Sequence, residues 1–148
     1  MKTFEELLQE AIQVSDKRKV VFNQLQSEIS NNYLPALATT LELYEESRVF
    51  LKLDTKCFAK QDYETDPLHG DMYYGICVFE NGSTSPAFRE EGDNRTIEWE
   101  PYGDQVSFKN FLCPKSACIE LACEIKKKIE QLNNHYSKLN EVAEKEML

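Results

Sequence analysis

The feature that most constrains this chain is a heptad pattern near its C-terminal end. Apolar residues recur there at alternating spacings of four and three for more than three heptads. Pro114 precedes the pattern and Ser116 offers an N-cap, so we predict a helix over residues 116–146. A strict period of 3.5 residues is typical of a helix that faces another long helix. The seam consists of Cys118, Ala122, Ile125, Ile129, Leu132, Tyr136, Leu139 and Ala143.

The sequence offers two partners for this seam. One is the first helix of the same chain, predicted over residues 3–30 because Thr3 and Glu6 form a capping box. This helix has two apolar stripes that differ in phase, so a kink or break near residues 15–19 is an alternative to a straight helix. The other partner is the same helix of a second subunit. Burial of each of the central residues Ile125, Ile129 and Leu132 contributes about 1.5–3 kcal/mol. An uncovered seam would therefore recruit a second chain, and we expect a homodimer. The oligomer seam would be Ile125, Ile129, Leu132, Tyr136 and Leu139.

The region between the two helices has the alternation of an antiparallel sheet. Residues 49–53 alternate in the manner of a half-buried strand. Asn81 and Gly82 form the strongest short hairpin signal, because both residues tolerate positive φ. Pro86 marks a short edge strand at residues 87–89, since proline cannot donate to a ladder.

Residues 33–46 fit two structures. Leu34, Leu37 and Leu41 have helical spacing, whereas the alternating apolar residues fit a strand equally well. We favour a strand from Thr39 onward, because β-branched and alternating residues begin there.

Together these elements predict the α+β class. A chain of 148 residues suits one compact domain, residues 1–148. It would contain the N-terminal helix, an antiparallel sheet of four to six strands within residues 39–112, and the C-terminal helix. The last strand would begin at Val106. No run of 18 apolar residues is present and the first residues lack the apolar core of a signal peptide, so we expect a cytoplasmic protein without membrane contact.

The net charge of −9 is concentrated in the middle of the chain. Residues 61–104 contain eleven acidic residues against Arg89 and Arg95 alone, and the flanking parts sum to zero. A negative field repels nucleic acid and attracts basic proteins. We therefore expect no direct binding of nucleic acid, and a basic protein as partner. The alternative is that the acidity serves solubility alone.

Residues 90–104 are the strongest candidate for the contact with this partner. They combine dense carboxylates with the only tryptophan, and aromatic anchors rimmed by charge are typical of interface hot spots. In an ordinary hairpin, Ile97 and Trp99 would face the core, and the acids between them would face water. The predicted partner-binding residues are Glu90, Glu91, Asp93, Glu98, Trp99, Glu100, Tyr102 and Asp104.

The cysteines and histidines give no motif for metal binding or catalysis. None of the five cysteines forms a C-x-x-C pair, which favours buried thiols in a reducing cytosol. The acidic loop at residues 62–71 includes His69 but departs from an EF-hand, because Pro67 and Tyr73 occupy the glycine and glutamate positions. We therefore expect no metal, no cofactor and no enzymatic activity. The cysteines are Cys57, Cys77, Cys113, Cys118 and Cys123.

These features predict a small acidic protein that binds another protein. The first hypothesis is an inhibitor of the immunity or anti-defence type, which docks a basic partner such as a nucleic-acid-binding enzyme. The second is an acidic dimeric chaperone or adaptor that holds a client protein. The third is a small enzyme or ligand-binding protein whose site has no recognisable motif.

Overall fold

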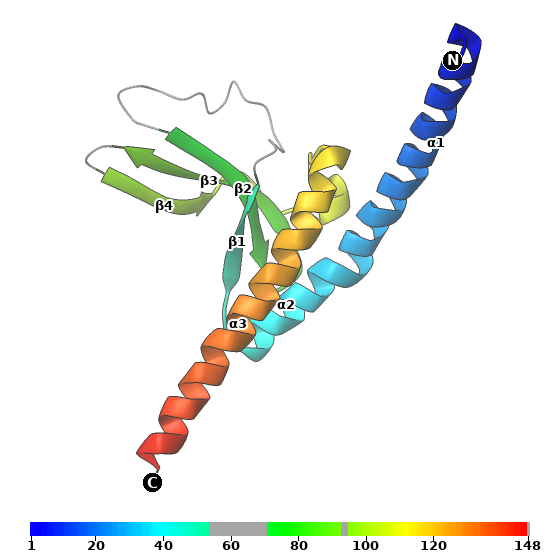
Figure 1. Ribbon diagram of the computed structural model, residues 1–148. Coiled ribbons are helices and arrows are strands. Elements are labelled where there is room, and N and C mark those ends of the chain that lie inside the picture. Colours follow the sequence, from blue (N-terminus) through cyan, green and yellow to red (C-terminus); the bar gives the residue numbers. More distant parts are fainter. Residues whose placement is uncertain (54–70, 93–94, 148) are drawn as a thin grey trace.

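The computed structural model describes residues 1–53, 71–92 and 95–147, and Figure 1 shows their arrangement. The α+β class is confirmed, because a four-stranded antiparallel sheet accompanies an N-terminal helix of 40 residues and a C-terminal helix of 32 residues. None of the described helices is long and apolar enough to cross a membrane. In chain order the elements are α1 (Phe4–Glu28), η1 (Ile29–Tyr33), α2 (Leu34–Leu43), β1 (Arg48–Leu53), β2 (Asp71–Phe79), β3 (Thr84–Gly92), β4 (Arg95–Pro101), η3 (Phe108–Asn110), η4 (Lys115–Ala117) and α3 (Cys118–Glu146).

The N-terminal helix is longer than its sequence pattern predicts. The Thr3 hydroxyl accepts the Glu6 N–H at 3.2 Å, as a capping residue should, and α1 then runs without interruption. Where we expected the helix to end, it widens into the π-helical turn η1 and continues as α2. Pro35 accounts for this turn, because its ring lacks an N–H and would collide with the carbonyl group four residues earlier in a regular helix. Accordingly, the Leu34 N–H donates to the carbonyl of Ile29, five residues back.

The prediction of a strand from Thr39 onward is wrong, because this segment belongs to α2. The helical spacing prevails because it buries Leu34, Leu37 and Leu41 together in the core. Strand alternation would have placed Leu43 on the same face, but Leu43 is 75% exposed. A short apolar segment satisfies both periods, and packing against the rest of the chain decides between them.

The four strands form a meander in the order β1-β2-β3-β4. The predicted hairpin turn is confirmed between β2 and β3, where Gly82 has a φ of 86°. The predicted edge strand is wrong, because Pro86 lies in β3, which pairs with β2 and with β4. Its missing N–H is harmless because β4 ends beside it. The Pro86 carbonyl accepts the Tyr102 N–H at 2.6 Å and the Ser85 hydroxyl at 3.1 Å. The expected last strand is reduced to a single bridge between Val106 and Thr84.

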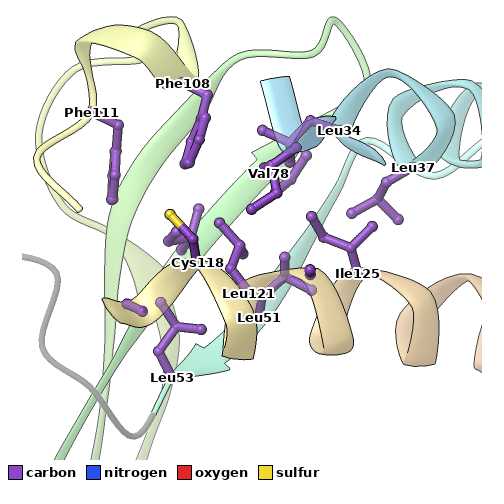
Figure 2. Packing of buried hydrophobic residues seen from close by; sticks show 14 of the residues in the cluster. Leu34, Leu37, Leu51, Leu53, Val78, Phe108, Phe111, Cys118, Leu121 and Ile125 are labelled. Carbon is purple, nitrogen blue, oxygen red and sulfur yellow. The ribbon is translucent and has the colours of Figure 1, made fainter. Parts of the chain in front are cut away.

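The main core lies between one face of the sheet and the helices α2 and α3, as Figure 2 shows. We call this face of the sheet the inner face. It contributes alternate residues of β1 and β2, which α3 and α2 cover. The core residues with 0% exposure that define this contact are Leu37, Leu41, Leu51, Ile76, Val78 and Leu121.

Candidate functional site

The predicted partner-binding residues lie on the β3–β4 hairpin and the segment that follows it. Glu90 and Glu91 of β3 are in register with Ile97 and Thr96 of β4, and Glu98 belongs to the same strand. Asp93 lies outside the described residues. Side chains of the set are described for Trp99, Glu100, Tyr102 and Asp104.

Trp99 does not belong to the main core. It lies on the opposite face of the sheet, where its ring stacks on Phe50 with a centroid separation of 6.1 Å and an interplanar angle of 16°. The ring also closes over Gly75, because a Cβ atom at that position would lie 3.2 Å from it. The expectation that Trp99 faces the core of an ordinary hairpin is therefore wrong. Trp99 is half-buried within the outer face of the sheet.

A β-bulge explains why simple alternation fails at Trp99. Phe88 pairs with Glu100, whereas Glu90 pairs with Ile97, so β4 contains one residue more than β3 between these pairs. A bulge breaks the period of two on which the alternation argument depends. The register of these two strands therefore cannot be read from β4 by itself.

The outer face of the sheet carries cations and aromatic rings, which the charge distribution of the sequence does not suggest. The Lys52 ammonium lies 4.4 Å from the centre of the Tyr73 ring, a cation–π contact. The Arg48 guanidinium lies 5.2 Å from the centre of the Phe50 ring. A hollow of about 140 Å³ is lined by Lys52, Tyr73, Arg89 and Trp99. This hollow is smaller than the pockets of about 300–1,000 Å³ that hold typical small-molecule ligands.

The acidic side chains of residues 61–104 that the structure describes are all exposed. Glu100, at the end of β4, and Asp104, in the segment that follows, are exposed. Tyr102 lies between them in the sequence and is 40% exposed. Its backbone N–H donates a hydrogen bond to the Pro86 carbonyl. Glu80, in the β2–β3 turn, adds another exposed carboxylate of the same acidic segment. We call Glu80, Glu100, Tyr102 and Asp104 the acidic margin.

The predicted oligomer seam is covered within one chain along most of its length. Ile125 is 1% exposed, and Ile129 and Leu132 pack against the main core. Tyr136 stacks on Tyr44, with ring centroids 4.2 Å apart and an interplanar angle of 6°. Of the five predicted seam residues, only Leu139 is largely exposed, at 48%. The helix that faces the seam is therefore α2, which continues the N-terminal helix.

Hydrogen bonds fix the end of α2 to α3 at this tyrosine pair. The Tyr44 hydroxyl donates to the Asn133 side chain at 2.5 Å. The Tyr136 hydroxyl donates to the Glu46 carboxylate and lies 3.0 Å from the Tyr44 carbonyl oxygen. The hydrogen bond to Glu46 raises the pKa of Tyr136 above its ordinary value. We interpret this cluster as a structural fastening, because each polar group has a partner within it.

The cysteines differ in exposure. Cys77 and Cys118 are buried as expected, Cys113 is half-buried, but Cys123 is exposed, contrary to the expectation of buried thiols. Burial raises the pKa of the Cys77 thiol to about 11. The pKa of the Cys118 thiol is raised far above its ordinary value. The larger cause is a side-chain hydrogen bond with Cys113, and burial adds to it. Raised thiol pKa values oppose formation of the thiolate, which is the nucleophilic form.

Metal ligands do not gather in the part of the chain that the structure describes. No group of three or more histidine, cysteine, aspartate or glutamate side chains there could hold an ion. His69, Cys57 and the acidic loop up to residue 70 lie outside the described residues. His135 is exposed on α3 and contacts the Tyr136 ring edge-on, with centroids 5.1 Å apart.

Comparison with known proteins gives no relative. No protein-family model, curated protein sequence or solved structure matches this chain.

Proposed function

We propose that this protein is a cytosolic, non-enzymatic binding protein that docks a basic protein partner through its acidic segment. The observation that carries the proposal is the confinement of the entire net charge of −9 to residues 61–104. The exposed carboxylates of the acidic margin belong to this segment, and the partly exposed Tyr102 lies between Glu100 and Asp104 in the sequence. A cluster of this kind attracts Lys and Arg side chains and accelerates association with a basic surface.

The partner that suits this surface is an enzyme that handles nucleic acid. Such enzymes present Lys and Arg side chains where they hold phosphates. A protein with closely spaced carboxylates can occupy such a site and exclude the phosphates from it. The proposed role is therefore that of an inhibitor, comparable in class with immunity proteins and inhibitors of host defence.

The experiment is capture of the basic partner from a lysate of the source organism, followed by titration at low and high salt. We expect the double variant Glu100→Lys, Asp104→Lys to weaken binding at least tenfold, or about 1.4 kcal/mol. Both side chains are exposed, so the variant should fold normally.

A matched control is the double variant Glu141→Lys, Glu144→Lys on α3, which changes the net charge by the same amount. Both positions are exposed. This control should bind nearly as tightly as the wild type. If the control weakens binding as much as the acidic-margin variant does, only net charge matters and the proposed surface is wrong.

A second candidate function is a dimeric adaptor or chaperone that holds a client protein. The observation that favours it is the exposure of large apolar side chains along α1, where Phe4 is 91% exposed and Leu8 61% exposed. Apolar contacts are little affected by salt, whereas carboxylate contacts are screened. Binding of a client that is insensitive to salt would favour the adaptor over the inhibitor.

A further inference from the structure

None of the described strands and other helices packs against the N-terminal part of α1. We call residues 4–21 the arm. All of them are exposed, and α1 runs away from the sheet in Figure 1. An isolated helix of this length is marginal in water, and monomeric proteins rarely expose a continuous apolar strip of this kind. The exposed apolar side chains include Phe4 (91%), Leu7 (48%), Leu8 (61%), Val14 (61%) and Val21 (47%).

Part of the apolar surface of the arm, on the side of Leu7 and Ala11, continues the face with which α1 enters the core. Leu7 and Ala11 lie 18 residues, or five full turns, before Leu25 and Ile29, so each pair points in one direction. Ile29 is 0% exposed and Leu25 packs against the main core. The body of the chain last contacts α1 near Asn23, whose side-chain oxygen accepts a hydrogen bond from Lys115 at 2.8 Å. Beyond that point, no residue in the described part of the chain covers this face.

The distribution of charged residues along the arm indicates which kind of surface would cover it. Its first half carries three acids, Glu5, Glu6 and Glu10. Its second half carries Asp16 and three bases at residues 17–19, so it is basic on balance. The Lys2 ammonium lies 2.5 Å from Glu10, which leaves the first half still acidic. A second arm laid antiparallel brings the acidic half of each copy against the basic half of the other. A parallel arrangement would oppose like charges in both halves.

The two-fold symmetry of such a pair also matches the apolar residues. Antiparallel arms centred between residues 12 and 13 place Phe4 opposite Val21 of the other copy, and Ala11 opposite Val14. A two-fold interface uses the same surface twice, so each contact occurs in duplicate. The far end of α3 is a poorer occupant. It also exposes Leu139 and Val142, but its charges are mixed in sign and include no basic block.

We propose that the arm binds the arm of a second copy of this chain in an antiparallel two-fold dimer. The interface is then α1, and not the seam of α3, most of which is covered within one chain. The proposal is independent of the partner-binding role of the acidic margin.

The test uses the full chain and two charge-reversal variants. In the first variant, Glu5, Glu6 and Glu10 are replaced by Lys. In the second, Lys17, Arg18 and Lys19 are replaced by Glu. The mass of each protein is measured by light scattering during size-exclusion chromatography across a range of concentrations.

We expect a dimer for the wild type, and at least a tenfold weaker dimer for each variant alone. An equimolar mixture of the two variants should recover the dimer, because the reversed halves are again complementary in the antiparallel arrangement. Leu7→Asp should produce a monomer with unchanged thermal stability of the body, since Leu7 makes no core contact. Reversal of the exposed charges Lys138, Glu141 and Glu144 of α3 is the control and should leave the dimer intact.

A wild-type monomer at every concentration would overturn the proposal. So would a dimer that survives Leu7→Asp, because its interface would lie elsewhere. A mixture of the two variants that stays monomeric would refute the pairing of the arms by charge. Separate variants that dimerise as tightly as the wild type would refute the antiparallel arrangement.

Discussion

Gly75 of β2 lies close to the backbone of β1 and to the ring of Trp99 on the outer face of the sheet. A Cβ atom at this position would lie 2.2 Å from the carbonyl oxygen of Leu51 and 3.2 Å from the ring of Trp99. Leu51 is fully buried in the main core, so the backbone that carries this oxygen cannot move aside without loss of packing. The substitution Gly75→Ala should therefore destabilise the protein.

The magnitude follows from two opposing effects. An extra methyl group in a filled site costs about 1–3 kcal/mol, and a backbone obstacle places this case at the upper end. Alanine recovers about 0.5–1 kcal/mol, because it loses less chain entropy on folding than glycine does. We expect a net loss of about 2 kcal/mol in the free energy of unfolding. For a chain of this size the melting temperature should fall by about 4–8 °C.

Trp99 makes this substitution easy to follow, because it is the only tryptophan and lies against the site. Chemical denaturation should be recorded by tryptophan fluorescence and by far-ultraviolet circular dichroism. Gly82→Ala is the control for backbone strain without a steric obstacle. The φ of 86° strains alanine by about 1–2 kcal/mol, but no atom lies within 4 Å of the added Cβ atom. Retention of wild-type stability by Gly75→Ala would refute the pairing of β1 with β2.

Four further predictions concern the helices and the thiols. Glu45 follows the end of α2 with a φ of 58°, a conformation that favours glycine. Glu45→Gly should therefore raise the free energy of unfolding by about 1 kcal/mol, measured by thermal denaturation, whereas Glu45→Ala should give no such gain. Ile129→Asp should lower the free energy of unfolding by about 2–3 kcal/mol, because it puts a charge against the main core, and wild-type stability in urea would contradict this placement. Cys123 should react with a thiol reagent before Cys77 does. Because the pKa of Cys77 is raised from 9.0 to about 11, its contribution to stability should be intact below pH 9 and lost as the pH rises toward 11, which denaturation at a series of pH values measures.

The C-terminal helix could be predicted from the sequence because its pattern is long. Seam residues from Cys118 onward repeat for more than three heptads, and no strand accommodates that spacing. The turn at Gly82 was equally accessible, because a positive φ restricts which residues can occupy it. Both signals are local, so they do not depend on the rest of the chain.

The helix α2 could not be predicted with the same means. Its ten residues satisfy a period of two as well as a period of 3.6, and Thr39 and Thr40 favour strands by composition. The structure shows that the Thr40 hydroxyl donates to the Ala36 carbonyl at 2.8 Å, which accommodates a β-branched residue within the helix. Burial against α3 decided the outcome, and that contact joins segments far apart in the sequence.

The surroundings of Trp99 depend on the order and register of the strands, and neither can be inferred from a single segment of the sequence. Phe50, Gly75 and Trp99 come from β1, β2 and β4, and they meet only because the strands form a meander. The bulge in β4 then shifts the alternation by one residue. The acidic character of the segment was visible in the sequence, whereas the cations of the outer face beside it were not.

Hydrogen–deuterium exchange with the captured partner tests the central claim most directly. Exchange is measured on the protein alone and in complex with the basic protein, at the same concentration of the chain. The account predicts that binding slows exchange in β4 and in the segment that follows it, around Tyr102 and Asp104. Protection confined to α1 or α3, with no change in this segment, would contradict the claim that the acidic margin is the docking surface.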